Sequence, residues 1–138
     1  MKKIIYLLSI ILLIFAVSII SCKKSSSGSA SVVGKWTMQK NVHVSTTSGT
    51  STYNYPTGSY IEYKTDATYT VYEPANGTSP SITSNGNYSI SGNTMTTTSN
   101  GSQPIIKSIQ TLDSHSLIMY AYNYNSVDTT KSTVYLTR

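Results

Sequence analysis

Few residues in this sequence are of the types that perform catalysis or hold metal ions. The two histidines, His43 and His115, lie far apart in the chain, and neither belongs to a recognisable catalytic motif. Three of the five acidic residues, Asp66, Asp113 and Asp128, fall in predicted turns or loops. Aspartates at such positions usually accept hydrogen bonds from their own backbone. No residues have the spacing of a metal-binding motif or a phosphate-binding loop. We therefore predict no enzymatic activity, no metal site and no cofactor.

The residue with the clearest chemistry is the single cysteine, Cys22. It follows a positive start at residues 1–3 and an apolar run over residues 4–20. A run of this length is slightly long for a signal-peptide core and at the short limit for a spanning helix. The sequence Ile19-Ile20-Ser21-Cys22 resembles the bacterial lipobox. The resemblance implies cleavage before Cys22 and a diacylglycerol on its sulfur, with acyl chains such as palmitate. The alternative is a plain membrane anchor with a chance cysteine.

This motif divides the chain into three parts: a signal peptide at 1–21, a lipidated serine-rich tether at 22–32, and a folded domain at 33–138. Serine-rich, glycine-containing segments have little to bury and stay flexible. Lys23 and Lys24, directly after the cysteine, favour the periplasmic side of a membrane. We expect a lipid-anchored protein of the bacterial cell envelope, held by acylated Cys22 at the outer membrane and facing the periplasm.

The charge distribution excludes nucleic acid as a partner. The chain has a formal charge of +5, but four of its ten basic residues lie within the first 24 positions. From Val32 onward, six basic residues stand against five acidic ones. Binding to phosphates requires a clustered basic face, which this region lacks. A disulfide scaffold is also excluded, because there is one cysteine.

The region from Val33 onward is typical of an all-β domain. It contains eleven of the twelve tyrosines among many Ser, Thr, Asn and Gly residues, with period-two patterns and recurring turn signals. In the first strand, Trp36, Met38, Val42 and Val44 are predicted to share one face. Residues 117–122 are apolar on both faces and predict the most enclosed strand. Loops are predicted at 45–52, 74–80 and 123–130. The eight predicted strands are 34–44, 59–64, 68–73, 87–91, 94–98, 105–112, 116–122 and 132–137.

Eight strands joined by short connections predict an antiparallel up-and-down barrel, because closure removes the exposed sheet edges. Gly34-Lys35-Trp36 near the start and Arg138 at the end resemble the lipocalin signature. Residues 63–69, 86–95, 112–117 and 136–138 are similar to the pattern of lipocalin-like domains in bacterial lipoproteins. The resemblance implies that Arg138 packs across Trp36 and closes one end of the barrel. Ala67 departs from the family, which usually has glycine there, so its turn must avoid a positive φ or tolerate strain.

The resemblance leaves two hypotheses for function. In the first, the barrel of the membrane-anchored protein binds a small hydrophobic or amphipathic ligand non-covalently. In the second, the barrel is filled with side chains, and the domain is an interaction module for a protein or glycan of the cell envelope. An enclosed volume of several hundred cubic ångströms would favour the first. Tyrosine suits both, since it serves in barrel walls and as a rigid binding plate. The candidate ligand-lining residues are Tyr60, Tyr63, Tyr69, Val71, Tyr120 and Tyr122.

Overall fold

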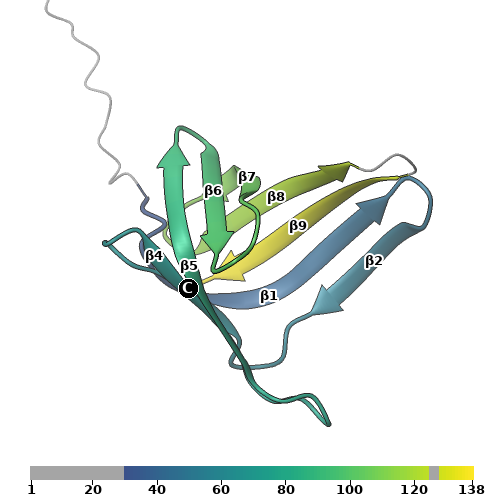
Figure 1. Ribbon diagram of the computed structural model, residues 1–138, viewed down its shortest axis with the longest axis horizontal. Coiled ribbons are helices and arrows are strands. Elements are labelled where there is room, and N and C mark those ends of the chain that lie inside the picture. The colour runs from purple at the N-terminus through teal and green to yellow at the C-terminus, as the bar shows by residue number, and fades with distance from the viewer. Residues whose placement is uncertain (1–29, 125–127) are drawn as a thin grey trace, which may run out of the picture.

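The computed structural model describes residues 30–124 and 128–138. Within them the chain forms nine strands, all paired antiparallel (Figure 1). The predicted signal peptide, Cys22 and most of the predicted tether lie outside the described residues. The strands are β1 (Gly34–Ser45), β2 (Gly49–Asn54), β3 (Tyr60–Tyr63), β4 (Thr68–Glu73), β5 (Ile82–Ser91), β6 (Thr94–Ser99), β7 (Ile105–Leu112), β8 (Ser116–Tyr124) and β9 (Thr129–Thr137).

Eight of these strands form a closed barrel. The order β1-β3-β4-β5-β6-β7-β8-β9 is completed by pairing of β9 with β1, from Thr37 opposite Thr137 to Ser45 opposite Thr130. Each strand of this ring therefore has two neighbours, and sequential strands are adjacent. The prediction of an all-β, eight-stranded antiparallel up-and-down barrel is confirmed.

The ninth strand, β2, was not predicted. We expected a loop over 45–52, but Gly49–Asn54 pairs with the second half of β1, from Lys40 opposite Asn54 to Ser45 opposite Gly49. The threonines and tyrosine of this segment favour a strand once a partner edge is available. β2 follows β3 along the same edge of β1 and lengthens the barrel wall there. β5 and β9 also begin earlier than predicted, at Ile82 and Thr129.

A β-bulge changes which residues of β1 face the interior. The pairing of β1 with β9 shifts between Met38 and Lys40, which leaves Gln39 as an extra residue. Met38 is buried inside, whereas Lys40 lies over the ring of Tyr135 on the outer face. Beyond the bulge Asn41 and His43 therefore face inward. The prediction that Val42 and Val44 share the face of Trp36 is wrong for this reason.

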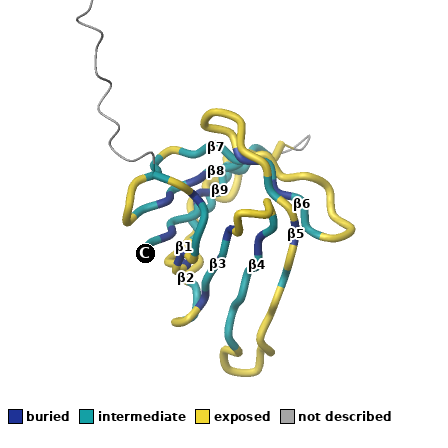
Figure 2. The backbone as a smooth tube through the Cα atoms, turned by 90° about the vertical axis from the view of Figure 1, so that its left-hand side faces the viewer, coloured by how far each residue is buried: buried dark blue, intermediate teal, exposed yellow. Residues whose placement is uncertain are grey.

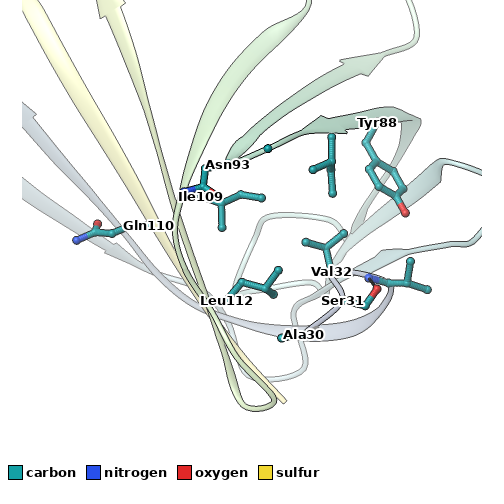
Figure 3. Close-up of a pocket in the computed structure, with 11 residues that line it drawn as sticks. Ala30, Ser31, Val32, Tyr88, Asn93, Ile109, Gln110 and Leu112 are labelled. Carbon is teal, nitrogen blue, oxygen red and sulfur yellow. Dashed lines mark hydrogen bonds between the residues drawn. The ribbon is translucent and has the colours of Figure 1, made fainter. Parts of the chain in front are cut away.

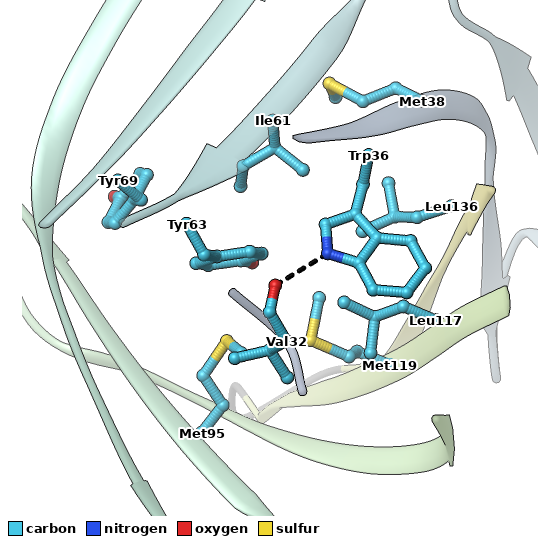
Figure 4. Close-up of a cluster of buried hydrophobic side chains, with 10 residues drawn as sticks. All are labelled: Val32, Trp36, Met38, Ile61, Tyr63, Tyr69, Met95, Leu117, Met119 and Leu136. Atoms are coloured by element: carbon cyan, nitrogen blue, oxygen red, sulfur yellow. Dashed lines mark hydrogen bonds between the residues drawn. The ribbon is translucent and has the colours of Figure 1, made fainter. Parts of the chain in front are cut away.

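The buried side chains gather toward one end of the barrel (Figures 2 and 4). They come from the first half of β1, from β3 and the start of β4, from β6, and from the halves of β8 and β9 that lie beside them. The cluster consists of Val32, Trp36, Met38, Ile61, Tyr63, Tyr69, Met95, Leu117, Met119 and Leu136. Only the first half of β8 is enclosed, since Tyr122 is 49% exposed and Tyr124 71% exposed. We predicted residues 117–122 as the most enclosed strand; Leu117 and Met119 are buried as expected, whereas Tyr122 is exposed.

This filled end of the barrel is closed by the segment that precedes β1. The indole Nε1 of Trp36 donates a hydrogen bond of 2.7 Å to the carbonyl oxygen of Val32 (Figure 4). The Arg138 guanidinium lies 3.8 Å from the centre of the Trp36 ring system. Its Nη2 donates to the carbonyl oxygens of Ser31 and Val33, at 3.0 and 2.6 Å. The structure thus brings Trp36 and Arg138 together at this end, which we call the closed end.

The turn between β3 and β4 tolerates strain. Ala67 has a φ of 64°, in the left-handed region that usually requires glycine. The turn is held around it: Asp66 accepts a hydrogen bond from the backbone N–H of Thr68, and the backbone N–H of Tyr88 donates to the Ala67 carbonyl at 2.8 Å. Of the two alternatives predicted for this turn, Ala67 therefore adopts the positive φ and tolerates the strain.

Candidate functional site

A cavity of about 770 Å³ lies at the opposite end of the barrel from Trp36. Four of its walls are the second half of β1, the start of β7, the end of β8 and the start of β9. The segment after β2 and the connection before β7 complete it. We call it the mouth cavity. Its lining residues are Asn41, His43, Tyr55, Gln103, Pro104, Ile105, Ile106, Lys107, Ala121, Tyr122, Asn123, Thr130, Ser132 and Val134.

The strand register explains why polar groups reach this cavity. Residues directly opposite each other in an antiparallel pair project to the same face of the sheet. Lys107 is opposite Met95, which is completely buried in the core, so the lysine side chain lies on the inner face. Asn41 is opposite Val134, which packs against the core. Two strands thus place a lysine and an amide beside the apolar interior.

Lys107 is the charged group of the mouth cavity. Burial lowers the pKa of its ammonium group, and no nearby charge contributes to the shift. The lining residues of this cavity include no Asp or Glu. Asn41 is fixed by Ser132, whose Oγ donates to Asn41 Oδ1 at 2.9 Å. The arrangement provides one partly buried cation beside polar and apolar wall residues.

The acidic residues nearest the rim are held by hydrogen bonds. Tyr53 OH donates to Glu73 Oε2 at 3.3 Å. The Asp128 carboxylate accepts from Ser45 Oγ at 2.8 Å, and from the backbone N–H and the hydroxyl of Thr46. These bonds lower the pKa of Asp128 to about 2. Asp128 thus links the start of β9 to the β1–β2 turn.

The other two turn aspartates behave as predicted. Asp66 accepts from the backbone N–H of Thr68, and Asp113 accepts from the backbone N–H groups of His115 and Ser116. These local bonds lower the pKa of both carboxylates. Both residues therefore stabilise turns.

Of the six candidate lining residues, only Tyr122 contributes to the mouth cavity. Tyr63 and Tyr69 belong to the buried core, and Val71 packs against it. The Tyr63 hydroxyl is buried without a hydrogen-bond partner among the described residues, and burial raises its pKa. Tyr60 lies under Lys35, and Tyr120 lies under Lys131.

Lys107 and Asn41 were not predicted as site residues, and His43 was considered only as a possible catalytic residue. One signal for Lys107 was available: it lies two residues from both Ile105 and Ile109, so a period-two reading puts it on their face. The inward direction of Asn41 and His43 depends on the bulge at Gln39, for which the sequence carried no signal that we recognised.

A second hollow, of about 810 Å³, lies at the closed end (Figure 3). It is bounded by residues 30–33, by parts of β5 and β7 that include Tyr88, Ile109 and Leu112, and by the turn between β5 and β6. Its lining includes no charged residue. Because one wall is the chain at the edge of the described residues, we take the mouth cavity as the candidate site.

The outer face of β8 carries a row of tyrosines. The rings of Tyr120 and Tyr122 meet edge to face at 5.6 Å, and those of Tyr122 and Tyr124 stack at 5.8 Å. The Lys131 ammonium lies 4.5 Å from the centre of the Tyr120 ring. This row is exposed at its Tyr122 and Tyr124 end.

Two kinds of feature are absent from the part of the chain that the structure describes. No group of three His, Cys, Asp or Glu residues is placed to hold a metal ion there. The same residues include no helix of the length and apolar character needed to cross a bilayer.

No protein-family model matches this chain, and no curated protein matches it. Among solved structures, the chain is similar to the bovine lipocalin allergen Bos d 2, with 19% sequence identity and a TM-score of 0.44. The match covers 76% of this chain and 71% of that chain. By its own strand number, order and closure, the barrel is lipocalin-like.

Proposed function

We propose that the protein binds a small amphipathic molecule non-covalently in the mouth cavity. The observation that carries the proposal is the cavity itself, which at about 770 Å³ falls within the range of about 300–1,000 Å³ typical of small-molecule sites. Its wall combines apolar side chains such as Ile105 and Val134 with the polar groups of Lys107 and Asn41. A few convergent polar groups in an apolar wall are the usual composition of a ligand site.

The distribution of the core supports this proposal. The large side chains, Trp36 and three methionines among them, fill the closed end. Toward the mouth the inward residues of β1 and β9 are smaller and more polar, namely Asn41, His43 and Ser132. The barrel is thus filled at one end and hollow at the other.

The test is native mass spectrometry of the protein purified from its own membranes, followed by extraction and identification of bound small molecules. We expect a stoichiometric species that is lost when Val134→Trp fills the cavity. The matched control is Ile118→Trp, on the neighbouring strand but in register with Tyr135 on the outer face. A protein that carries no small molecule, and takes up none from an added lipid extract, would contradict the proposal.

We also propose that Cys22 carries the membrane anchor. The lipobox resemblance of residues 19–22 supports this, and the anchor would place the protein in the bacterial cell envelope, at the outer membrane and facing the periplasm. Cys22→Ala is expected to abolish labelling by radioactive palmitate and to leave an uncleaved precursor or a released protein. Ser21→Leu, which puts a large side chain before the cleavage site, should block processing while the thiol is retained. Unchanged labelling in Cys22→Ala would contradict the proposal.

The second candidate function is recognition of an envelope protein or glycan. The exposed row formed by Tyr120, Tyr122 and Tyr124 favours it, because flat aromatic plates with a polar edge suit such partners. Replacing Tyr120 and Tyr124 with Ser should abolish capture of the partner without changing ligand content, because neither residue lines the mouth cavity. Unchanged capture by this double variant would assign the partner to another surface.

A further inference from the structure

We propose that the ligand of the mouth cavity is a single-chain amphiphile that enters head first, with an acidic head group bound to Lys107 and its apolar chain lying toward the rim. This inference rests on the proposed function and specifies the chemistry of its ligand. The acidic group is a carboxylate or a phosphate, since both present oxygens to an ammonium group.

The strand register shows how deep Lys107 and Asn41 lie in the mouth cavity. β7 runs from the rim at Ile105 toward the closed end, and Lys107 is opposite the fully buried Met95. On β1, Asn41 is opposite Val134, which packs against the core, whereas Ser45 lies where β1 ends. The lysine and the amide therefore lie at the inner end of the cavity.

The rim has apolar side chains at the start of β7, while Gln103, Asn123 and Thr130 of the lining are polar. Ile105 lines the cavity and is 51% exposed. The neighbouring Ile106 is 65% exposed. Figure 1 shows β1, β2, β8 and β9 extending together beyond the rest of the barrel. The one lysine of the lining thus lies at the inner end, and isoleucines lie at the rim, which favours a ligand that enters by its acidic head group.

The charge of the lining determines the sign of the head group. Its residues include Lys107 and His43 and no acidic side chain. Glu73 is hydrogen-bonded to Tyr53, and Asp128 is hydrogen-bonded to the β1–β2 turn. Burial lowers the pKa of Lys107, so its charged form lacks the stabilisation that water would give. An anion brought beside it would restore that stabilisation, whereas a second cation would be repelled.

The experiment measures binding of four eight-carbon probes: octanoate, octyl phosphate, octanol and octyltrimethylammonium. The full chain is held in phosphatidylcholine nanodiscs at pH 7, and isothermal titration calorimetry is corrected with empty nanodiscs. We expect octanoate or octyl phosphate to bind at least tenfold more tightly than octanol, with no binding of the cation. The stronger of the two anions identifies the preferred acid.

Two variants test the role of Lys107. Lys107→Met should remove the preference for the anion while octanol binding is retained. Lys131→Met is the matched control, because Lys131 lies over Tyr120 outside the cavity, and it should keep the preference. Circular dichroism verifies that both variants fold. Equal affinity for octanoate and octanol, or an anion preference that survives Lys107→Met, would overturn the inference and leave the proposed function standing. Failure of all four probes to bind would overturn both.

The direction of entry is tested with modified acids. A dansyl group on the terminal carbon of undecanoate should change its affinity less than threefold, because that end lies at the rim. Methyl esterification of the carboxylate should weaken binding at least tenfold. The opposite result, with the ester tolerated and the terminal dansyl group rejected, would show entry by the tail.

Discussion

Replacing Trp36 with alanine is expected to remove about 3–5 kcal/mol from the free energy of unfolding. The indole is completely buried, and large-to-small changes of buried aromatic residues typically cost this amount. The same change removes the 2.7 Å hydrogen bond to the Val32 carbonyl and the contact with the Arg138 guanidinium. Since domains of this size have total stabilities of about 5–15 kcal/mol, the variant should be close to unfolding at 37 °C.

The assay is urea denaturation followed by far-ultraviolet circular dichroism, because indole fluorescence is lost in the variant. Trp36→Phe is the control: it keeps most of the aromatic volume and removes the N–H donor. Its expected loss is about 1–2 kcal/mol, because Arg138 also donates to the Val32 carbonyl, at 3.4 Å. A loss below about 1 kcal/mol for Trp36→Ala would refute the assignment of the indole as the centre of the closed end.

Three further substitutions test the backbone and the electrostatics. Ala67→Gly should raise the free energy of unfolding by about 0.5–1 kcal/mol, and the urea midpoint with it. Glycine relieves the left-handed strain at φ 64°, and this gain exceeds the cost of its greater flexibility in the unfolded chain. An unchanged or lower midpoint would mean that the turn is not strained. Gly86→Ala should cost about 2–3 kcal/mol in the same assay, because a Cβ there would collide with the Thr98 carbonyl oxygen; full stability would show that β5 and β6 are further apart. The pKa of Asp128 is lowered from 3.8 to about 2, so its charged form stabilises the fold above about pH 4, and this stability is lost as the pH falls toward 2. Asp128→Asn should therefore lower the thermal midpoint at pH 7, and its difference from the wild type should shrink between pH 5 and 2; a difference that is constant with pH would exclude the carboxylate charge as its origin.

The strand pattern was predictable from the sequence because period-two alternation and turn residues are local signals. The direction of individual side chains was less predictable, because it depends on register. The extra residue at Gln39 reverses the faces of β1, so Val42 turns outward and His43 turns inward. No local feature of 38–44 distinguishes this arrangement from a regular strand.

The same reasoning applies to the site. Trp36 and Arg138 could be paired in advance because a family resemblance linked them. The tyrosines could not be assigned, because Tyr suits the core, the wall and an outer surface equally well. Lys107 was counted only as part of the net charge, although its position between Ile105 and Ile109 was visible in the sequence. In a barrel strand, a lysine with apolar residues at both i−2 and i+2 is predicted to face the interior.

The closed end also lies beside the point at which the barrel joins the preceding segment of the chain. The described residues begin at Ala30, close to Arg138, which follows the last strand. Arg138 donates hydrogen bonds to the carbonyl groups of Ser31 and Val33. If Cys22 carries a lipid, the attachment would lie on the side of the closed end, and the mouth cavity would open at the opposite end of the barrel.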